Sequence, residues 1–200
     1  IHDRHLPAAI LFSNPSFLRP CVGIQPRDGV HLHTYAADLA RSPNGTWWVI
    51  SDRTQNPSGI GYALENRLVS ARTLPSVFNQ CRVRPMVAFL EKRRRALLEL
   101  GSHTSDSPRV VVMTPGPNNE TYFEHSFLAH HWGFPLVEGA DLTVRNNQVF
   151  LKPLGGLERV DVIVATGGTP VVRSAYRSGN PAIGVGPGNV PVLVDATADI

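Results

Sequence analysis

The loop between residues 52 and 61 carries side chains that suit an anionic ligand. Asp52, Arg53 and Gln55 follow a run rich in β-branched and aromatic residues, and Ser58-Gly59 comes shortly after them. Small residues let the backbone approach a ligand, and a guanidinium and backbone amides are donors for a phosphate or a carboxylate. Asp52 adds an oxygen ligand of the kind that Mg²⁺ prefers. The alternative is a plain hairpin-to-helix connection, in which Asp52 caps a turn and Arg53 is solvated.

A second polar cluster follows the apolar run from Arg109 to Met113. Loops at strand ends of open α/β sheets commonly bind ligands, so this cluster can face a substrate. The competing interpretation makes Asn119 a helix cap, places Tyr122 in the core and leaves Glu124 in solvent. Two carboxylates after the next apolar run can likewise hold an amine or simply solvate a loop. The candidate substrate-binding residues are Asn119, Glu120, Tyr122, Glu124, Glu138 and Asp141.

A third candidate site opens after the apolar run from Val160 to Ala165. The segment Thr166-Gly167-Gly168-Thr169 separates this run from a predicted helix at residues 170–177, which has proline in its first turn. Backbone amides at such a helix start are donors for a phosphate. The plain alternative is a tight strand-to-helix turn.

The strands that would position these residues are short apolar or alternating runs. Extended runs at 32–41 and 46–52 flank Ser42-Pro43-Asn44-Gly45, which predicts a β-hairpin because Asn and Gly tolerate positive φ. A second hairpin is predicted to turn at Asn146-Asn147. Buried strands are predicted at 109–113, 134–137 and 160–165.

Helical stretches alternate with these strands. Helices are predicted from Tyr62 to before Pro75, within residues 83–101, and from Tyr122 to Trp132, where Gly133 supplies a stop. The alternation predicts an α/β fold of mixed α+β type.

Composition argues against membrane and nucleic-acid partners. Of the 200 residues, 42% are hydrophobic and 18% are charged, and no apolar stretch approaches the roughly 20 residues of a membrane-spanning helix. The formal net charge is only +3, with no basic block beyond residues 92–95. We therefore expect no membrane and no nucleic-acid partner.

The cysteines and histidines lack metal-binding spacing. Cys21 and Cys81 lie far apart and near no His pair, so we expect buried free thiols in a cytoplasmic protein. The histidines lack a third ligand at a recognisable spacing. The opening residues IHDRHLP form neither a start-methionine terminus nor a signal peptide, so we expect the chain to be a fragment at that end.

Three motifs resemble those of the circularly permuted ATP-grasp proteins. They are DRTQNPSGIGYALENR at 52–67, TPGPNNETYFEH at 114–125 and LVEGADL at 136–142. The resemblance covers residues 1–163 and implies a glutathione-synthetase-like mixed sheet flanked by helices. It also implies that ATP and Mg²⁺ are bound, and that a carboxylate is activated for attack by an amine of a small-molecule or peptide-like substrate. The nucleotide-binding residues that it implies are Asp52, Arg53, Gln55, Ser58, Gly59, Asn66 and Arg67.

The loop departs from the family pattern where metal ligands are expected. Better-understood relatives carry Glu, Asn and Arg at alternate positions before Pro-Ser-Gly, whereas this chain has Ser51, Arg53 and Gln55, a version that a subset of the family resembles. Asp52 is then the only carboxylate in that loop, and a neutral Ser and a cationic Arg cannot replace two magnesium ligands. We therefore expect no ligase activity from these residues and assign no catalytic residue.

The residues from Val164 to Ile200 resemble the cofactor-binding domain of a CoA-acylating aldehyde dehydrogenase. The motifs ATGG, AYRSG, PAIGVGPGNVP and DATADI carry this resemblance. It implies that Thr166, Gly167, Gly168 and Thr169 contact NAD(P), and that the nucleophilic Cys of that family lies beyond Ile200. The join falls at residues 160–163, which both families plausibly share.

This join predicts two parts. Residues 1–159 form a partial ATP-grasp-like domain, and residues 160–200 form a partial dehydrogenase-like segment with a β-α-β fold. Three functions stay open: an ATP-grasp-like ligase fragment or nucleotide-binding relative, an NAD(P)-binding dehydrogenase fragment, and an inert chimera of the two. The inert chimera is favoured, because the ligase-like part lacks the C-terminal half of its ATP site and the dehydrogenase-like part lacks its nucleophilic Cys.

Overall fold

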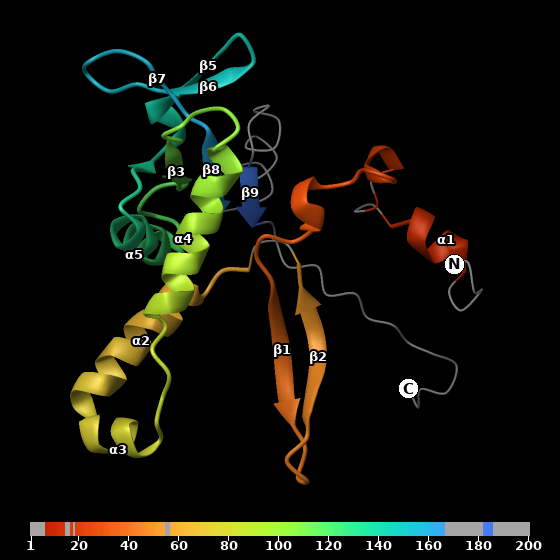
Figure 1. Cartoon of the computed structure of the whole chain (residues 1–200), viewed down its shortest axis with the longest axis vertical. Coiled ribbons are helices and arrows are strands. Elements are labelled where there is room, and N and C mark those ends of the chain that lie inside the picture. The colour runs from red at the N-terminus through yellow and green to blue at the C-terminus, as the bar shows by residue number, and fades with distance from the viewer. Residues whose placement is uncertain (1–6, 15–16, 18, 55–56, 167–181, 186–200) are drawn as a thin grey trace. The chain divides into compact units, whose positions relative to one another are not determined.

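The computed structural model describes residues 7–14, 17, 19–54, 57–166 and 182–185, which fall into two units. The first unit, Ile1–Leu32, contains the short helix α1 (Ala8–Phe12) and the 3₁₀ turns η1 (Arg19–Cys21) and η2 (Arg27–Gly29). Within it, the Arg19 guanidinium lies 5.0 Å from the centre of the Phe12 ring. The second unit, His33–Ile200, contains every other element (Figure 1).

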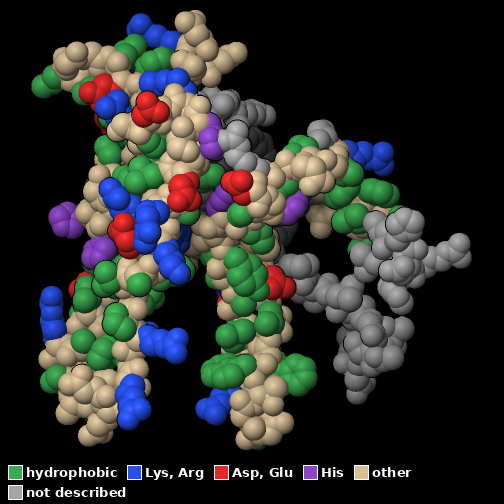
Figure 2. All heavy atoms as spheres, in the orientation of Figure 1, with side chains coloured by type: hydrophobic (Ala, Val, Ile, Leu, Met, Phe, Trp, Pro, Cys, Tyr) green, Lys and Arg blue, Asp and Glu red, His purple; other side chains and the backbone are tan. Residues whose placement is uncertain are grey.

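The first predicted hairpin is confirmed. Strands β1 (Ala36–Arg41) and β2 (Trp47–Arg53) pair antiparallel, and Gly45 in the connecting turn has φ +88°. The Ser42 hydroxyl donates to the Thr46 carbonyl oxygen across the turn at 3.1 Å. Four successive apolar residues of β2, Trp47 to Ile50, are each more than half exposed, and Figure 2 shows hydrophobic side chains along this hairpin.

A parallel sheet forms the centre of the second unit. Its order is β4-β3-β8-β9, with β3 at Val110–Met113, β4 at Leu136–Val137, β8 at Val162–Thr166 and β9 at Ala182–Val185. All three pairings are parallel. The continuous apolar runs predict this arrangement, because strands of a parallel sheet are covered on both faces.

Three helices cover one face of this sheet. They are α2 (Ile60–Thr73), α4 (Val87–Gly101) and α5 (Tyr122–Trp132), and a further short helix, α3 (Pro75–Gln80), follows α2. Alternate residues of β3 and β8 point to this face, where Val112 and Val164 pack into one cluster with Leu64, Leu97 and Trp132. Figure 1 shows α4 and α5 beside the sheet.

A small antiparallel sheet contributes to the core on the other face. It consists of β5 (Leu142–Arg145), β6 (Gln148–Leu151) and β7 (Glu158–Arg159), and it follows the turn η3 (Gly139–Asp141). Val149 packs there with Val111 and Ile163. Asn146 and Asn147 have φ of 50° and 58°, which confirms the predicted tight turn.

One buried carboxylate, Asp161, links the connection after α4 to the central sheet. The Asp161 side chain is 5% exposed and accepts hydrogen bonds from the Thr104 hydroxyl at 2.7 Å and the Arg109 amide at 2.9 Å. Both donors precede β3, so this carboxylate links the α4–β3 connection to the start of β8.

The predicted mixed α/β fold is confirmed, with local corrections. Strand β7 and helix α3 were not predicted, because runs of two and six residues give little periodicity. Of the predicted β-α-β tail, the strands β8 and β9 are present and parallel, while the helix at 170–177 lies outside the described residues. The expectation of buried thiols is wrong, since Cys21 and Cys81 are both free and exposed.

Within the part of the chain described here, no helix has both the length and the apolar character needed to traverse a bilayer.

Candidate functional site

The carboxyl ends of three parallel strands bring predicted site residues to one edge of the sheet. Met113 of β3 pairs with Val137 of β4 and with Ala165 of β8. The next residue along each strand, among them Glu138, therefore emerges at the same edge. This is the place where open α/β sheets commonly bind ligands.

The loop after β3 lies directly against Glu138. Gly116 has φ +107°, and a Cβ built on it would lie 3.4 Å from Glu138 Oε2. Only glycine adopts this backbone conformation without strain, and the side chain that it lacks leaves room for the carboxylate. The two loops that were predicted to face a substrate are thus in contact.

Glu138 and Asp141 form a reciprocal cap on η3. The Glu138 amide donates to Asp141 Oδ2 at 2.8 Å, and the Glu138 side chain accepts from the backbone at the third position of the turn. This capping box orients both carboxylates, and both residues remain exposed. Their predicted role toward an amine substrate stays a prediction.

A hydrogen-bonded chain runs through the interior beside this edge. The Gly116 amide donates to Thr114 Oγ1 at 3.3 Å, and that hydroxyl lies 2.9 Å from His125 Nδ1. On the other side of the ring, His125 Nε2 lies 3.0 Å from Thr121 Oγ1, whose hydroxyl donates to Asn119 Oδ1. Thr114 and His125 are 1% and 2% exposed, so their hydrogen bond is shielded from water, whereas Asn119 and Thr121 are partly buried.

These contacts identify the tautomer of the neutral His125 ring, which carries its proton on Nε2. Thr121 gives its proton to Asn119, so it accepts from His125 Nε2–H, and Nδ1 then accepts from the Thr114 hydroxyl. Burial lowers the pKa of His125 below its ordinary value of 6.5, and the charge of Glu124 opposes this effect. A proton added at Nδ1 would reverse this bond, because the ring would then donate to Thr114 Oγ1.

We expect the free energy of unfolding to fall as the pH drops below about 6.5. The pKa of His125 is lower in the folded state, so the unfolded chain binds the proton first, and the stability present above that pH is lost on acidification. Urea denaturation at a series of pH values from 7.5 to about 5 measures this slope.

The variant His125→Asn should flatten the slope, whereas His130→Asn, at an exposed position of the same helix, should leave it unchanged. An unchanged slope in His125→Asn would show that another group titrates.

The predicted anion-binding loop is occupied by a side chain of the protein itself. The Gly59 amide donates to Glu124 Oε1 and Oε2 at 2.7 and 2.8 Å, and the Gly61 amide donates to Oε1 at 2.8 Å. Glu124 is 2% exposed, although it was predicted to face a substrate. Sequence analysis named Gly59 and Glu124 as members of two separate sites and did not pair them.

A small cavity of about 20 Å³ adjoins this carboxylate. Ser58, Glu124, His125 and Arg93 are among the residues that line it. A space of this size holds about one water molecule. Burial lowers the pKa of Arg93 below its ordinary value, and the charge of Glu124 opposes this.

Asp52 and Arg53 lie on opposite faces of β2. The Tyr35 hydroxyl donates to Asp52 Oδ1 at 2.6 Å, which raises the pKa of Tyr35. Arg53 Nε forms an ion pair with Asp38 Oδ2 at 3.0 Å, and Ser51 donates to the same oxygen. Hydrogen bonds from Ser51 and Arg53 lower the pKa of Asp38.

Asp38 was missed by sequence analysis, because its partners depend on an irregularity in the strand pairing. It pairs with Ser51 across the predicted hairpin, and side chains of directly opposite residues share one face. Counting back from the Asn-Gly turn pairs Asp38 with Ile50 and puts Arg53 on the opposite face, and only the register shift between Asp38 and Leu39 brings Ser51 and Arg53 beside Asp38.

The described hairpin does not fit a two-carboxylate magnesium site. The guanidinium of Arg53 occupies both oxygens of Asp38 at 3.2 and 3.0 Å, and Asp52 is the only carboxylate of β2. Mg²⁺ demands near-octahedral oxygen ligands, and the positive charge of the guanidinium repels the ion. Among the residues that the structure describes, no three His, Cys, Asp or Glu side chains converge on a metal position.

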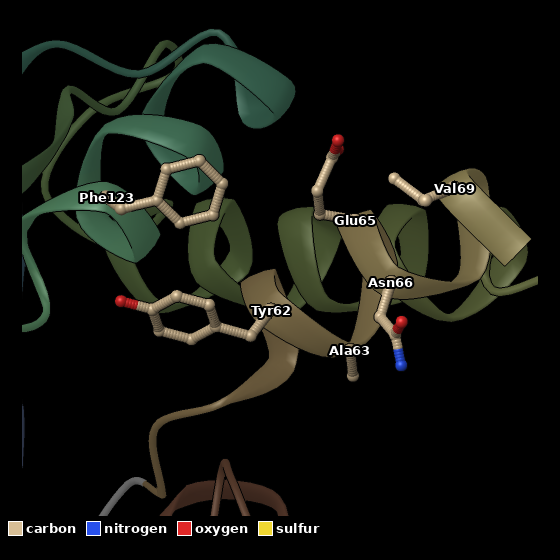
Figure 3. Close-up of a pocket in the computed structure, with 6 residues that line it drawn as sticks. All are labelled: Tyr62, Ala63, Glu65, Asn66, Val69 and Phe123. Atoms are coloured by element: carbon tan, nitrogen blue, oxygen red, sulfur yellow. The ribbon is translucent and has the colours of Figure 1, made fainter.

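The remaining predicted nucleotide residues lie on α2. Arg67 donates from Nη1 to the Arg84 carbonyl oxygen at 2.7 Å, so it joins α2 to the segment before α4. Asn66 lines an open groove of about 490 Å³ with Glu65 and the rings of Tyr62 and Phe123 (Figure 3). The two ring centres are 5.3 Å apart.

Other predicted site residues lie wholly or partly outside the described residues. Gln55, Gly167, Gly168 and Thr169 lie outside the described residues, and Thr166 is described only by its backbone in β8. Tyr122 is partly buried in the first turn of α5, and Glu120 is exposed, with its carbonyl oxygen accepting from the Tyr62 hydroxyl at 3.1 Å.

Uncharacterized bacterial proteins resemble most of the chain. A protein from Synechocystis sp. is 38% identical over 94% of this chain, which spans 42% of that relative. A protein from Mycobacterium tuberculosis is 42% identical over 80% of this chain, which corresponds to 18% of that relative's length. A protein from Mycobacterium leprae is 40% identical over 82% of this chain, which corresponds to 29% of that relative's length. The chain thus spans less than half the length of each of these relatives.

The family model for circularly permuted ATP-grasp type 2 matches residues 1–187. This match passes through residues 160–163 without a break, so the dehydrogenase-like interpretation of the tail and its NAD(P) site gain no support from it. The family resemblance predicted for residues 1–163 is confirmed. The chain belongs to the circularly permuted ATP-grasp type 2 family.

Proposed function

We propose that this chain is the nucleotide-binding and substrate-binding part of an ATP-grasp protein of the carboxylate–amine ligase type. The observation that carries the proposal is the contact between the loop after β3 and Glu138 after β4, at the carboxyl edge of the parallel sheet. Membership in the family supports ATP as the ligand.

The substrate side of the proposal uses exposed acidic and amide groups. Glu138 and Asp141 are held in fixed positions by their capping box, and Glu120 precedes α5 nearby in the chain. Carboxylates in fixed positions are suited to an ammonium group, so the substrate class is an amine of a small molecule or peptide.

The nucleotide side uses β2 and α2. Asp52, Arg53, Gln55 and Ser58 belong to the connection between these elements, and Arg53 supplies a cation for a phosphate. The groove beside Asn66 offers the aromatic faces of Tyr62 and Phe123, on which a purine ring can stack.

We further propose that the chain binds ATP without turning it over. A magnesium ion would need a second carboxylate, but the Asp38 carboxylate is occupied by its ion pair with Arg53. Asp52 is then the one carboxylate of the hairpin that remains as a metal ligand. Magnesium should therefore add little to nucleotide affinity. A cytoplasmic location, expected from the free thiols, is consistent with ATP as the ligand.

We expect ATP to bind with a dissociation constant between about 1 µM and 1 mM, as is usual for small-molecule substrates. Isothermal titration calorimetry measures it with Mg²⁺ and with EDTA, and the two values should agree within about twofold because two metal ligands are missing. Arg53→Gln should weaken binding roughly five- to tenfold through the loss of one charged hydrogen bond.

Arg95→Gln serves as the matched control, because Arg95 is an exposed arginine on α4 that forms an ion pair with Glu91 four residues before it. NADH titrated in parallel tests the dehydrogenase-like interpretation. Absence of ATP binding, or tighter binding of NADH than of ATP, would contradict the proposed function.

A further inference from the structure

The N-terminus of α2 has the features of an anion site. This helix has 14 residues, and its first amides carry partial positive charge because they have no carbonyl partner within the helix. Gly59 precedes it in a left-handed conformation with φ +108°, which directs its N–H toward the same point as the N–H of Gly61. Phosphates and carboxylates bind at such points.

The occupant of this site is Glu124, which is separated from Gly59 by 65 residues in the chain. Two amides reach its carboxylate through three contacts of 2.7 to 2.8 Å, the length of charge-assisted bonds. The side chain is 2% exposed, and α2 has no other side-chain cap. The contact from Gly61 is buried, and the two contacts from Gly59 are partly buried.

The residues around Glu124 leave room for its side chain and fix the position of its backbone. A Cβ on Gly61 would lie 2.8 Å from Glu124 Cγ, so glycine is the residue that allows the close approach. His125, the next residue, is fixed on both ring nitrogens, which prevents the start of α5 from turning away. The water-sized cavity next to the carboxylate is lined by Ser58 of the loop.

We propose that Glu124 is a built-in anionic ligand that fills the α2 anion site and positions the Ser58-Gly59 loop. The phosphates of a bound ligand therefore do not use the amides of Gly59 and Gly61. This inference does not depend on the proposed function, because it concerns an interaction within the unliganded chain.

The test removes the Glu124 carboxylate by mutation and supplies acetate in solution as its replacement. Glu124→Ala removes a CH₂–COO⁻ group and leaves a space that matches acetate. We expect the melting temperature of this variant to fall by roughly 10 °C. Acetate should then raise it in a saturable way, while acetamide, which lacks the charge, should not. The wild-type chain and Glu120→Ala, which lacks an exposed carboxylate, should show no acetate-specific rise.

A spectroscopic measurement keeps the inference testable if Glu124→Ala folds poorly. In a chain labelled with ¹⁵N-glycine, the amide protons of Gly59 and Gly61 should lie downfield in the wild type and move upfield in the milder variant Glu124→Gln. Inorganic phosphate should shift these two signals in Glu124→Ala and leave them unchanged in the wild type.

Two results would overturn the inference. One is Gly59 and Gly61 signals that stay in place in Glu124→Gln. The other is phosphate shifting them in the wild type, which would mean that the site is open to ligands. A wild-type chain that fails to bind ATP would remove the proposed function and leave this inference intact.

Discussion

Replacing Glu124 by alanine should lower the free energy of unfolding by about 3–5 kcal/mol. The substitution removes three contacts to a buried carboxylate and leaves the amides of Gly59 and Gly61 without their acceptor. Each amide deprived of a partner away from water costs about 1–3 kcal/mol. Urea denaturation followed by far-ultraviolet circular dichroism gives the difference.

The matched control for this prediction is Glu120→Ala, a carboxylate four residues earlier that is exposed. Its effect should stay within about 0.5 kcal/mol, as for most surface substitutions. A loss below about 1 kcal/mol in Glu124→Ala would mean that another group or a water molecule satisfies the two amides, and that the carboxylate does not hold α2 against α5.

Gly61→Ala should lower the free energy of unfolding by about 1–3 kcal/mol, the usual cost of overpacking. Alanine is favoured over glycine inside a helix by about 1 kcal/mol, so propensity alone predicts the opposite sign. Packing decides the outcome, because the new methyl would lie 2.8 Å from Glu124 Cγ and 3.5 Å from its Cα. That side chain cannot swing aside without breaking its contacts to the backbone.

Gly155→Ala provides the comparison, since a Cβ at that position meets no atom within 4 Å. It should be neutral or slightly stabilising, by up to about 1 kcal/mol, because it reduces the freedom of the unfolded chain. Chemical denaturation of both variants under the same conditions measures the contrast. Equal effects would show that Gly61 is present for reasons other than its approach to Glu124.

Elements with strong local signals were predicted closely from the sequence. Helix α5 runs from Tyr122 to Trp132 as expected, and Gly133 ends it in a left-handed conformation with φ 69°. The hairpin at Asn146-Asn147 was found because two residues that tolerate positive φ lie between two short β runs. In each case the determinant is contained within a few neighbouring residues.

The pairing of Glu124 with α2 was not predicted, because it joins positions far apart in the chain. A helical periodicity nevertheless pointed to it. The buried positions of α5 are Glu124, His125, Leu128, Ala129 and Trp132, which form one stripe. A carboxylate inside such a stripe needs a partner, and a glycine in the first turn of another helix is a place where backbone amides can approach.

The tail illustrates a different limit of sequence reasoning. The strand from Val162 to Thr166 joins the central sheet beside β3, as the apolar run predicted. The same run suits a parallel strand in many α/β proteins, so it cannot identify the family of the residues that follow. The family match extends to residue 187 and does not mark the join that motif resemblance suggested.

The most direct test of the account is to map ATP onto the ¹⁵N-labelled chain by amide chemical shifts. We predict saturable shifts at Asp52, Arg53 and Ser58, in Mg²⁺ and in EDTA alike, with the amides of Gly59 and Gly61 unchanged because Glu124 holds them. Shifts that are largest at Gly59 and Gly61, or shifts that appear only with Mg²⁺, would contradict the account.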